Sequence, residues 1–184
     1  MKFKKNMALR VNSGALKSRL LKKFISNYGY WLGGFFTQEL RSGGVREGFI
    51  LKTPRGGWEL LASKKIISKT VFNKYGVNLP ALDVLGVQSL VQARKEGKIV
   101  LLDELGPLIL QSEKLAVQAL DALGSGETPC LATFRKGAKT FEEAFLKMDN
   151  TIVLDLNGKT FTEVEAVLEG WLEFWIDRLK AEGC

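Results

Sequence analysis

The sequence predicts an α/β protein in which helices cover both faces of a mainly parallel sheet. Ile99–Leu102 is an apolar run without polar alternation, which is typical of a strand buried on both faces. Met7–Val11 is a short β-prone run that leads through a turn into apolar residues at helical spacing. Beyond residue 110, strand-like runs alternate with helix-start signals. Together these patterns favour a layered α/β architecture.

Length and composition indicate one soluble domain. The 184 residues contain no low-complexity linker, so we expect a single domain over residues 1–184. No apolar run approaches the ~18–20 residues that span a membrane. The N-terminus lacks a signal-peptide layout. We therefore expect a cytoplasmic protein without a membrane partner.

The residue types restrict the chemistry. The chain has no histidine and two cysteines, Cys130 and Cys184, which excludes a Cys/His zinc site and every Ser-His or Cys-His nucleophile. Catalysis must then use carboxylates, lysine or a metal. Residues 1–74 contain 16 Lys/Arg and 3 Asp/Glu, whereas residues 75–184 contain 11 and 17. Such a basic half favours a polyanion, either a triphosphate or nucleic acid, or is a solvated lysine-rich surface.

The turn after Met7–Val11 has the position of a phosphate-binding loop. The segment Val11–Ser18 reads VNSGALKS, and we expect the helix to follow it, from about Arg19. Compared with G-x-x-x-x-G-K-[ST], the segment keeps Lys17 and Ser18 but has Val11 and Leu16 at the glycine positions. Taken alone, this match is weak.

Glycine-rich connections dominate the next part of the chain. They join β-prone runs between Gly33 and Ala62, which favours an antiparallel meander, with an insertion at about residues 35–62. A helix is expected from about Pro80 to Glu96, leading into the central strand.

Asp103 and Glu104 directly follow the central strand Ile99–Leu102. The carboxyl ends of parallel strands form the edge where open α/β sheets bind ligands. Two adjacent carboxylates there favour a nearby cation or a water-filled site. The alternative from the residues alone is a solvated acidic turn.

The C-terminal half supplies the remaining elements. The expected elements are a helix capped by Ser112 and ending near Leu123, a strand at Pro129–Phe134, a short helix opened by a Thr140/Glu143 capping box, a strand at Thr151–Leu156 and a last helix opened by Thr160/Glu163. The last helix carries one apolar stripe, which indicates core packing, with a partner-binding surface as the alternative.

Several short motifs, in order, resemble one family. The K-S loop, GFFTQELR, GVREGF, KYGVN, LLDELGPL and LATF together resemble the thermophilic-type (cancer-related) nucleoside-triphosphatase family of P-loop proteins over nearly the whole chain. The resemblance implies a RecA-like three-layer α/β/α fold with a small antiparallel insertion. It also implies Mg²⁺-dependent hydrolysis of nucleoside triphosphates such as ATP and GTP.

The resemblance also assigns residues. Lys17 would contact the β- and γ-phosphates and act in catalysis with Glu104, which would activate water, while Ser18 and Asp103 would hold Mg²⁺. The nucleotide-binding loop would comprise Asn12, Ser13, Gly14, Ala15, Leu16, Lys17, Ser18 and Arg19. Thr37, Glu39, Arg41 and Thr133 would be accessory residues.

The chain departs from the family pattern at four positions. Val11 and Leu16 replace glycines, Ile109 stands where Glu is usual, and Arg135 replaces a usual His. A β-carbon costs roughly 1–2 kcal/mol where φ must be positive, and a leucine beside the phosphates would hinder them. If so, restoring both glycines should raise turnover. Three hypotheses therefore stand: a hydrolase, a non-hydrolysing nucleotide-binding or protein-interaction module, and a nucleic-acid-binding protein.

Overall fold

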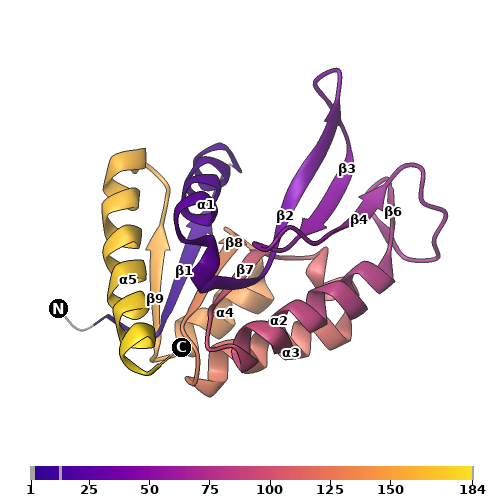
Figure 1. The fold of residues 1–184 in the computed structure, drawn as a ribbon. Coiled ribbons are helices and arrows are strands. Elements are labelled where there is room, and N and C mark those ends of the chain that lie inside the picture. The colour runs from indigo at the N-terminus through magenta and orange to yellow at the C-terminus, as the bar shows by residue number, and fades with distance from the viewer. Residues whose placement is uncertain (1–2, 13, 184) are drawn as a thin grey trace.

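The computed structural model describes residues 3–12 and 14–183. Within them, nine strands form one sheet in the order β5-β6-β4-β3-β2-β7-β8-β1-β9 (Figure 1). The strands are β1 (Asn6–Val11), β2 (Leu32–Ser42), β3 (Val45–Lys52), β4 (Trp58–Ser63), β5 (Val71–Phe72), β6 (Tyr75–Val77), β7 (Ile99–Leu105), β8 (Cys130–Arg135) and β9 (Thr151–Asp155). The helices are α1 (Gly14–Tyr28), α2 (Val87–Lys95), α3 (Glu113–Ser125), α4 (Lys139–Lys147) and α5 (Phe161–Ala181). Short helical turns are η1 (Gly29–Trp31), η2 (Ala81–Gly86) and η3 (Ile109–Gln111).

The sheet has a parallel half and an antiparallel half. Strand β1 lies between β8 and β9, and β7 lies between β8 and the start of β2, all in parallel pairs. The four predicted parallel strands are thus confirmed as members of one sheet. The remaining pairs, β2–β3, β3–β4, β4–β6 and β5–β6, are antiparallel. The carboxyl ends of β1, β7 and β8 therefore meet at one edge.

Two apolar cores, one on each face of the sheet, produce the three layers. Alternate residues of β7 serve different cores: Ile99 and Leu101 pack with α1 and α5, whereas Val100 and Leu102 pack with α2, α3 and α4. Figure 1 shows the same division of helices. The apolar run without polar alternation was therefore a correct signal of burial on both faces. The three-layer α/β/α prediction is confirmed.

The glycine pair at the start of β2 lies inside the parallel half of the sheet. The sequence predicted an antiparallel insertion from about residue 35 and no parallel strand here, but residues Leu32–Phe35 pair in parallel with β7. A β-carbon on Gly33 would lie 2.4 Å from that of Ala93 in α2. Gly34 has φ +82°, and a β-carbon there would lie 2.3 Å from the Leu101 carbonyl oxygen. These glycines permit close packing inside the sheet rather than a turn.

Helix boundaries agree with the capping signals in two cases and differ in two others. The Ser112 hydroxyl accepts a hydrogen bond from the Leu115 N–H, and Thr160 forms the predicted capping box with Glu163. The Thr140 prediction is wrong, because α4 begins at Lys139, so Thr140 lies inside the helix, and the residue before it, Ala138, provides no side-chain cap. Helix α1 begins at Gly14 rather than near residue 19.

Among the helices described, none has both the length and the apolar character needed to cross a membrane.

Candidate functional site

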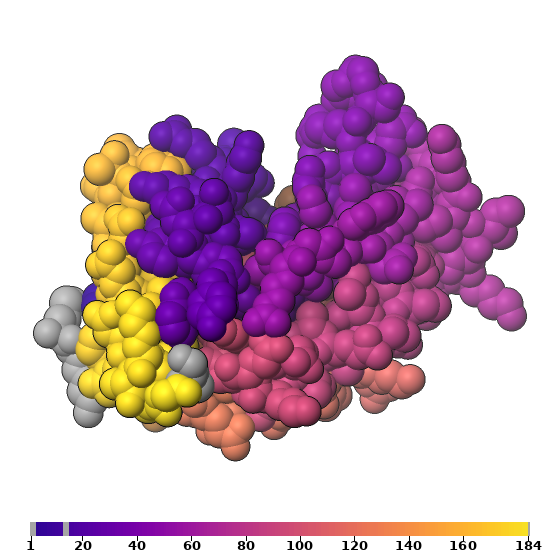
Figure 2. Space-filling view, viewed as in Figure 1, coloured from indigo at the N-terminus to yellow at the C-terminus, as the bar shows by residue number. Residues whose placement is uncertain are grey.

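A large cleft opens at the carboxyl edge of the parallel strands. It lies between α1 and the hairpin formed by β2 and β3, and its volume is about 1190 Å³. Figure 2 shows the molecular surface hollowed between these two parts of the chain. Six basic side chains and three carboxylates line it: Lys17, Lys22, Arg41, Arg46, Lys52 and Arg135, with Glu39, Asp103 and Glu104. The excess of positive charge suits a polyphosphate.

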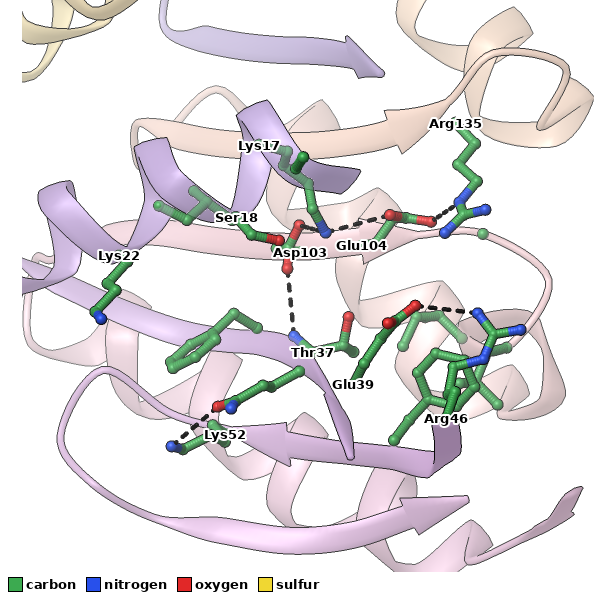
Figure 3. Close-up of a pocket in the computed structure, with 18 of the residues that line it drawn as sticks. Lys17, Ser18, Lys22, Thr37, Glu39, Arg46, Lys52, Asp103, Glu104 and Arg135 are labelled. Carbon is green, nitrogen blue, oxygen red and sulfur yellow. Dashed lines mark hydrogen bonds and ion pairs between the residues drawn. The ribbon is translucent and has the colours of Figure 1, made fainter. Parts of the chain in front are cut away.

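Lys17 extends from the first turns of α1 to both carboxylates at the end of β7. Its Nζ lies 2.8 Å from Asp103 Oδ1 and 3.2 Å from Glu104 Oε2 (Figure 3). Only 7% of the Lys17 side chain is exposed. Burial by itself lowers the pKa of Lys17, but the two carboxylates outweigh it and the pKa is raised. Lys17 is therefore a buried ammonium held at the ligand-binding edge of the sheet.

Asp103 is fixed by two further strands, β8 and β2. Its Oδ1 accepts a hydrogen bond from the Thr133 hydroxyl of β8, and its Oδ2 accepts one at 3.3 Å from the Thr37 N–H of β2. Adjacent residues in a regular strand point to opposite faces, yet both carboxylates approach Lys17. The register of β7 against β8 shifts just after Leu102, where the strand leaves regular geometry. Thr133 is buried behind Asp103 and does not line the cleft.

Glu104 has a second basic partner that sequence reasoning did not assign to the site. Arg135 Nε lies 2.6 Å from Glu104 Oε1, and Arg135 lines the cleft. The sequence did contain a signal for it, because Arg135 ends the β8 strand at the same edge as Asp103. Glu104 thus lies between an ammonium and a guanidinium, both of which hold its carboxylate toward the cleft (Figure 3).

The oxygen donors near Lys17 fit a magnesium ion that is shared with a substrate. Ser18 follows Lys17 in α1, and both Ser18 and Asp103 line the cleft (Figure 3). Within residues 3–12 and 14–183, no cluster of three or more Asp, Glu or Cys side chains is arranged to hold a metal by itself. Magnesium commonly uses one or two protein oxygens together with phosphate oxygens, so a hydroxyl and a carboxylate suffice.

The hairpin side of the cleft contains the remaining predicted accessory residues. Glu39 accepts hydrogen bonds from two guanidinium groups: Arg41 Nη2 lies 2.6 Å from Oε2 and Arg46 Nη1 lies 3.0 Å from Oε1. Desolvation tends to raise the pKa of Glu39, but the hydrogen bonds from Arg46 and Arg41 lower it overall. Thr37 is on the same strand and contacts Asp103 through its backbone. Arg46 was not singled out from the sequence.

Only part of the predicted nucleotide-binding loop lines the cleft. Ala15, Lys17 and Ser18 do so. Arg19 instead lies over the Phe161 ring, with its guanidinium carbon 3.8 Å from the ring centroid. Asn12 is exposed and is not a lining residue, Gly14 begins α1, and Ser13 lies outside the described residues. The structure therefore concentrates the predicted residues around Lys17 rather than along the whole loop.

Val11 and Leu16 do not crowd the cleft. Leu16 is in α1, where φ is negative, so its β-carbon carries no left-handed strain. Its side chain packs against the core shared by α1 and α5, and Val11 is fully part of that core. The expected left-handed strain at these two positions is therefore absent, and neither side chain lines the cleft.

Replacing both residues with glycine should destabilise the fold. Val11→Gly with Leu16→Gly removes buried apolar surface and helix propensity, so the free energy of unfolding should fall by roughly 3–5 kcal/mol. Urea denaturation measures this loss. Val117→Gly, at an exposed position of α3, should cost only about 1 kcal/mol. A double variant as stable as the parent, with faster phosphate release, would restore the idea that the side chains hinder the site.

The arrangement defines a class of protein. Strand β1 leads into helix α1, which carries Lys17 and Ser18. Strand β7, which is separated from β1 by β8, carries Asp103 and Glu104 at its carboxyl end, and Lys17 contacts Asp103 there. This is the three-layer architecture of P-loop nucleoside triphosphatases. The chain belongs to the NTPase family, whose model matches residues 6–161. It is a nucleoside-triphosphate hydrolase by family, in agreement with the sequence resemblance.

Relatives and solved structures agree with this assignment. The nucleoside-triphosphatase THEP1 of Thermotoga maritima is 33% identical over 146 residues, which cover 79% of this chain and 83% of the relative. THEP1 of Thermococcus kodakarensis is 30% identical over 141 residues, covering 71% and 78%. The crystal structure of THEP1 from Aquifex aeolicus matches with a TM-score of 0.72 at 23% identity, covering 92% and 99%. The solution structure of a human cancer-related nucleoside triphosphatase matches at 0.68 and 20%, covering 93% and 97%. The two structures support the fold.

Proposed function

We propose that the cleft binds the magnesium complex of a nucleoside triphosphate such as ATP or GTP and hydrolyses it to the diphosphate and phosphate. The observation that carries the proposal is the convergence of Lys17 with Asp103 and Glu104 in one cleft. Residues so far apart in sequence have no local reason to meet there. An ammonium for the phosphates, a carboxylate for a metal ion and a second carboxylate for the attacking water are the groups that phosphoryl transfer to water commonly uses.

Lys17 would exchange its carboxylate partners for phosphate oxygens when substrate binds. The first turn of an α-helix leaves N–H groups without intrahelical acceptors, and the positive end of its dipole favours anions. Helix α1 begins at Gly14, three residues before Lys17, so Lys17 lies at the end of its first turn. Phosphates at this helix end would be within the reach of the Lys17 side chain. This geometry supports phosphate binding even without a glycine-rich loop.

Ser18 and Asp103 would hold the magnesium ion. When bound, magnesium neutralises charge on the β- and γ-phosphates and orients them. Asp103 is suited to this role because Thr133 and Thr37 already fix the direction of its carboxylate. Lys17 must move off Asp103 for this to occur, and the incoming phosphates give it a new partner.

Glu104 would activate the attacking water. The water oxygen attacks the γ-phosphorus, its proton passes to the Glu104 carboxylate, and the bond from the γ-phosphorus to the bridging oxygen breaks with its electron pair going to the diphosphate. Arg135 now pairs with Glu104 but lines the cleft, so it can turn to the γ-phosphate and release Glu104. That exchange would couple substrate binding to the freeing of the base.

A second candidate function is nucleotide binding without hydrolysis. It is favoured by the short connection between β1 and α1, since Ala15 and Leu16 are helical and cannot wrap a phosphate as a glycine-rich loop does. This reading keeps Lys17 and Ser18 as contacts but gives Glu104 no chemical role. Phosphate release separates the two candidates.

The test of the proposed function is nucleotide binding with and without magnesium. By calorimetry, a non-hydrolysable ATP analogue should bind at least about tenfold more tightly with magnesium than without it. Ser18→Ala should remove most of that difference, because the variant loses one metal ligand and keeps Lys17. Ser125→Ala, at the far end of α3, is the matched control and should keep it.

Absence of nucleotide binding in the parent, with or without magnesium, would contradict the proposal. Magnesium-dependent binding without phosphate release from ATP or GTP would instead select the non-hydrolysing module. A Ser18→Ala variant that retains the full magnesium effect would show that the ion is not held at this hydroxyl.

A further inference from the structure

The cleft is larger than a typical pocket for one small ligand. Its volume of about 1190 Å³ exceeds the roughly 300–1,000 Å³ typical of pockets for one small ligand. The residues proposed to bind the triphosphate occupy only the part beside α1 and the end of β7. The rest of the cleft, the hairpin compartment, is lined by Glu39, Arg46, Phe49, Phe72, Leu108 and Ile109. The proposed hydrolase reaction gives these residues no role.

The hairpin compartment has more hydrogen-bond donors than the protein uses. Arg46 and Arg41 share the single carboxylate of Glu39. The Nε of Arg46 is buried and has no acceptor anywhere in the described chain, although 38% of the Arg46 side chain is exposed. A buried donor without an acceptor is costly, and an arginine has five N–H donors in a fork that matches oxyanions. The buried Nε itself is closed to the cleft, but the exposed part of the same guanidinium lines the cleft and can receive an anionic group.

Aromatic rings lie directly beside these donors. The Arg46 guanidinium carbon lies 5.2 Å from the centroid of the Phe49 ring, and Phe49 packs edge to face with Phe72 at 6.1 Å. Both rings are half-buried and line the cleft, while Leu108 and Ile109 close the compartment from the segment that follows β7. An apolar or aromatic ring would replace water on these surfaces favourably. The two features together favour an anion that carries a ring.

The position of the compartment relates it to the reaction. In-line transfer requires the attacking group and the leaving diphosphate on opposite sides of the γ-phosphorus. Lys17 and Arg135 contact different oxygens of Glu104, and Figure 3 shows Glu39 and Arg46 across the cleft from Glu104. A molecule in the hairpin compartment would therefore face Glu104, the residue proposed to activate the attacking water.

We propose that the hairpin compartment binds a second small molecule, an anion carrying an apolar or aromatic ring, at the same time as the nucleoside triphosphate. This proposal rests on the proposed function, because it takes the neighbouring part of the cleft to bind a nucleoside triphosphate. Arg46 binds the anionic group, Phe49 and Phe72 contact the ring, and the occupant controls access of water to the γ-phosphate.

Phenyl phosphate is a suitable probe because it combines a ring with a phosphate and has no nucleoside. Calorimetry should detect its binding to protein saturated with magnesium and a non-hydrolysable ATP analogue. Arg46→Ala should weaken phenyl phosphate by about tenfold or more, the loss expected for a charged hydrogen-bonding partner. Glu39→Gln should strengthen it severalfold, because a competing carboxylate is neutralised. Arg55→Ala, which removes an arginine outside the cleft, should leave it unchanged.

The opposite effects of Arg46→Ala and Glu39→Gln distinguish a binding role from a structural one, since loss of hairpin structure would weaken binding in both. In phosphate-release assays, phenyl phosphate should lower kcat without raising KM for ATP. Displacement of the ATP analogue by phenyl phosphate, or equal affinity in parent and Arg46→Ala, would overturn the proposal. If the analogue itself fails to bind, the nucleotide site is wrong, and phenyl phosphate binding that depends on Arg46 but not on Lys17 would still establish the compartment.

Discussion

Glu104→Gln is expected to lower the turnover of ATP or GTP by roughly 10²–10⁴-fold, the usual contribution of a general base. The amide keeps the shape of the side chain and can still contact Lys17 and Arg135, but it cannot take the proton from water. The affinity for the magnesium–nucleotide complex should change little, because Glu104 is not assigned to the metal or to the phosphates. Phosphate release in a single-turnover assay and calorimetric binding give the two quantities separately.

The control for this variant is Glu59→Gln, on an exposed position of β4 outside the cleft. It removes the same charge from the surface and should keep the parent turnover. A Glu104→Gln variant with parent turnover would show that another group, or water alone, accepts the proton. A parent enzyme without phosphate release above a no-enzyme blank would remove the hydrolase reading altogether.

The core of the fold could be predicted because its signals are local and strong. Ile99–Leu102 lacks polar alternation, and the structure places its residues alternately in the two cores. Ser112 and Thr160 are polar residues placed before apolar helical patterns, and both cap helices. In each case the local preference and the tertiary packing require the same conformation.

The errors arose where a local signal had two physical meanings. Glycine permits a turn, but it also permits close backbone packing, and only the positions of Ala93 and Leu101 show that Gly33 and Gly34 serve the second purpose. The motif comparison treated Leu16 as a failed loop glycine. In the structure it is an ordinary helix residue that packs on the core, because the helix begins at Gly14.

The candidate site was predictable at the shared carboxyl edge of the parallel strands, and less so at the β2–β3 hairpin. Parallel strands bring their carboxyl ends together, so Lys17 and Asp103 could be expected to meet, and their atoms lie 2.8 Å apart. Arg46 gave no such signal. Its place in the cleft depends on how far β2 continues beyond the edge of β7 and on the register of the β2–β3 pair, which no short motif specifies.

Lys17→Ala is expected to weaken nucleotide binding by roughly 10–100-fold, because a charged hydrogen bond to phosphate is worth about 1.5–3 kcal/mol. Turnover should fall as well, since the ammonium faces phosphate charge in both the ground and the transition state. The variant should therefore lose affinity and rate together, whereas Glu104→Gln loses rate alone. Binding and single-turnover assays on the two variants show this contrast.

The same substitution should destabilise the ligand-free protein. Asp103 is 1% exposed, and without Lys17 its partners among the described side chains and backbone are the uncharged donors Thr133 and Thr37. Removing one member of a buried ion pair costs roughly 3–5 kcal/mol. Because the pKa of Lys17 is raised by its carboxylates, the contribution of the pair is fully present below the unfolded value of about 10.4 and is lost only as pH rises through the folded pKa. Urea denaturation should therefore show a constant difference between parent and variant from about pH 6 to 9. Equal stability over that range would mean that the pair does not exist in solution.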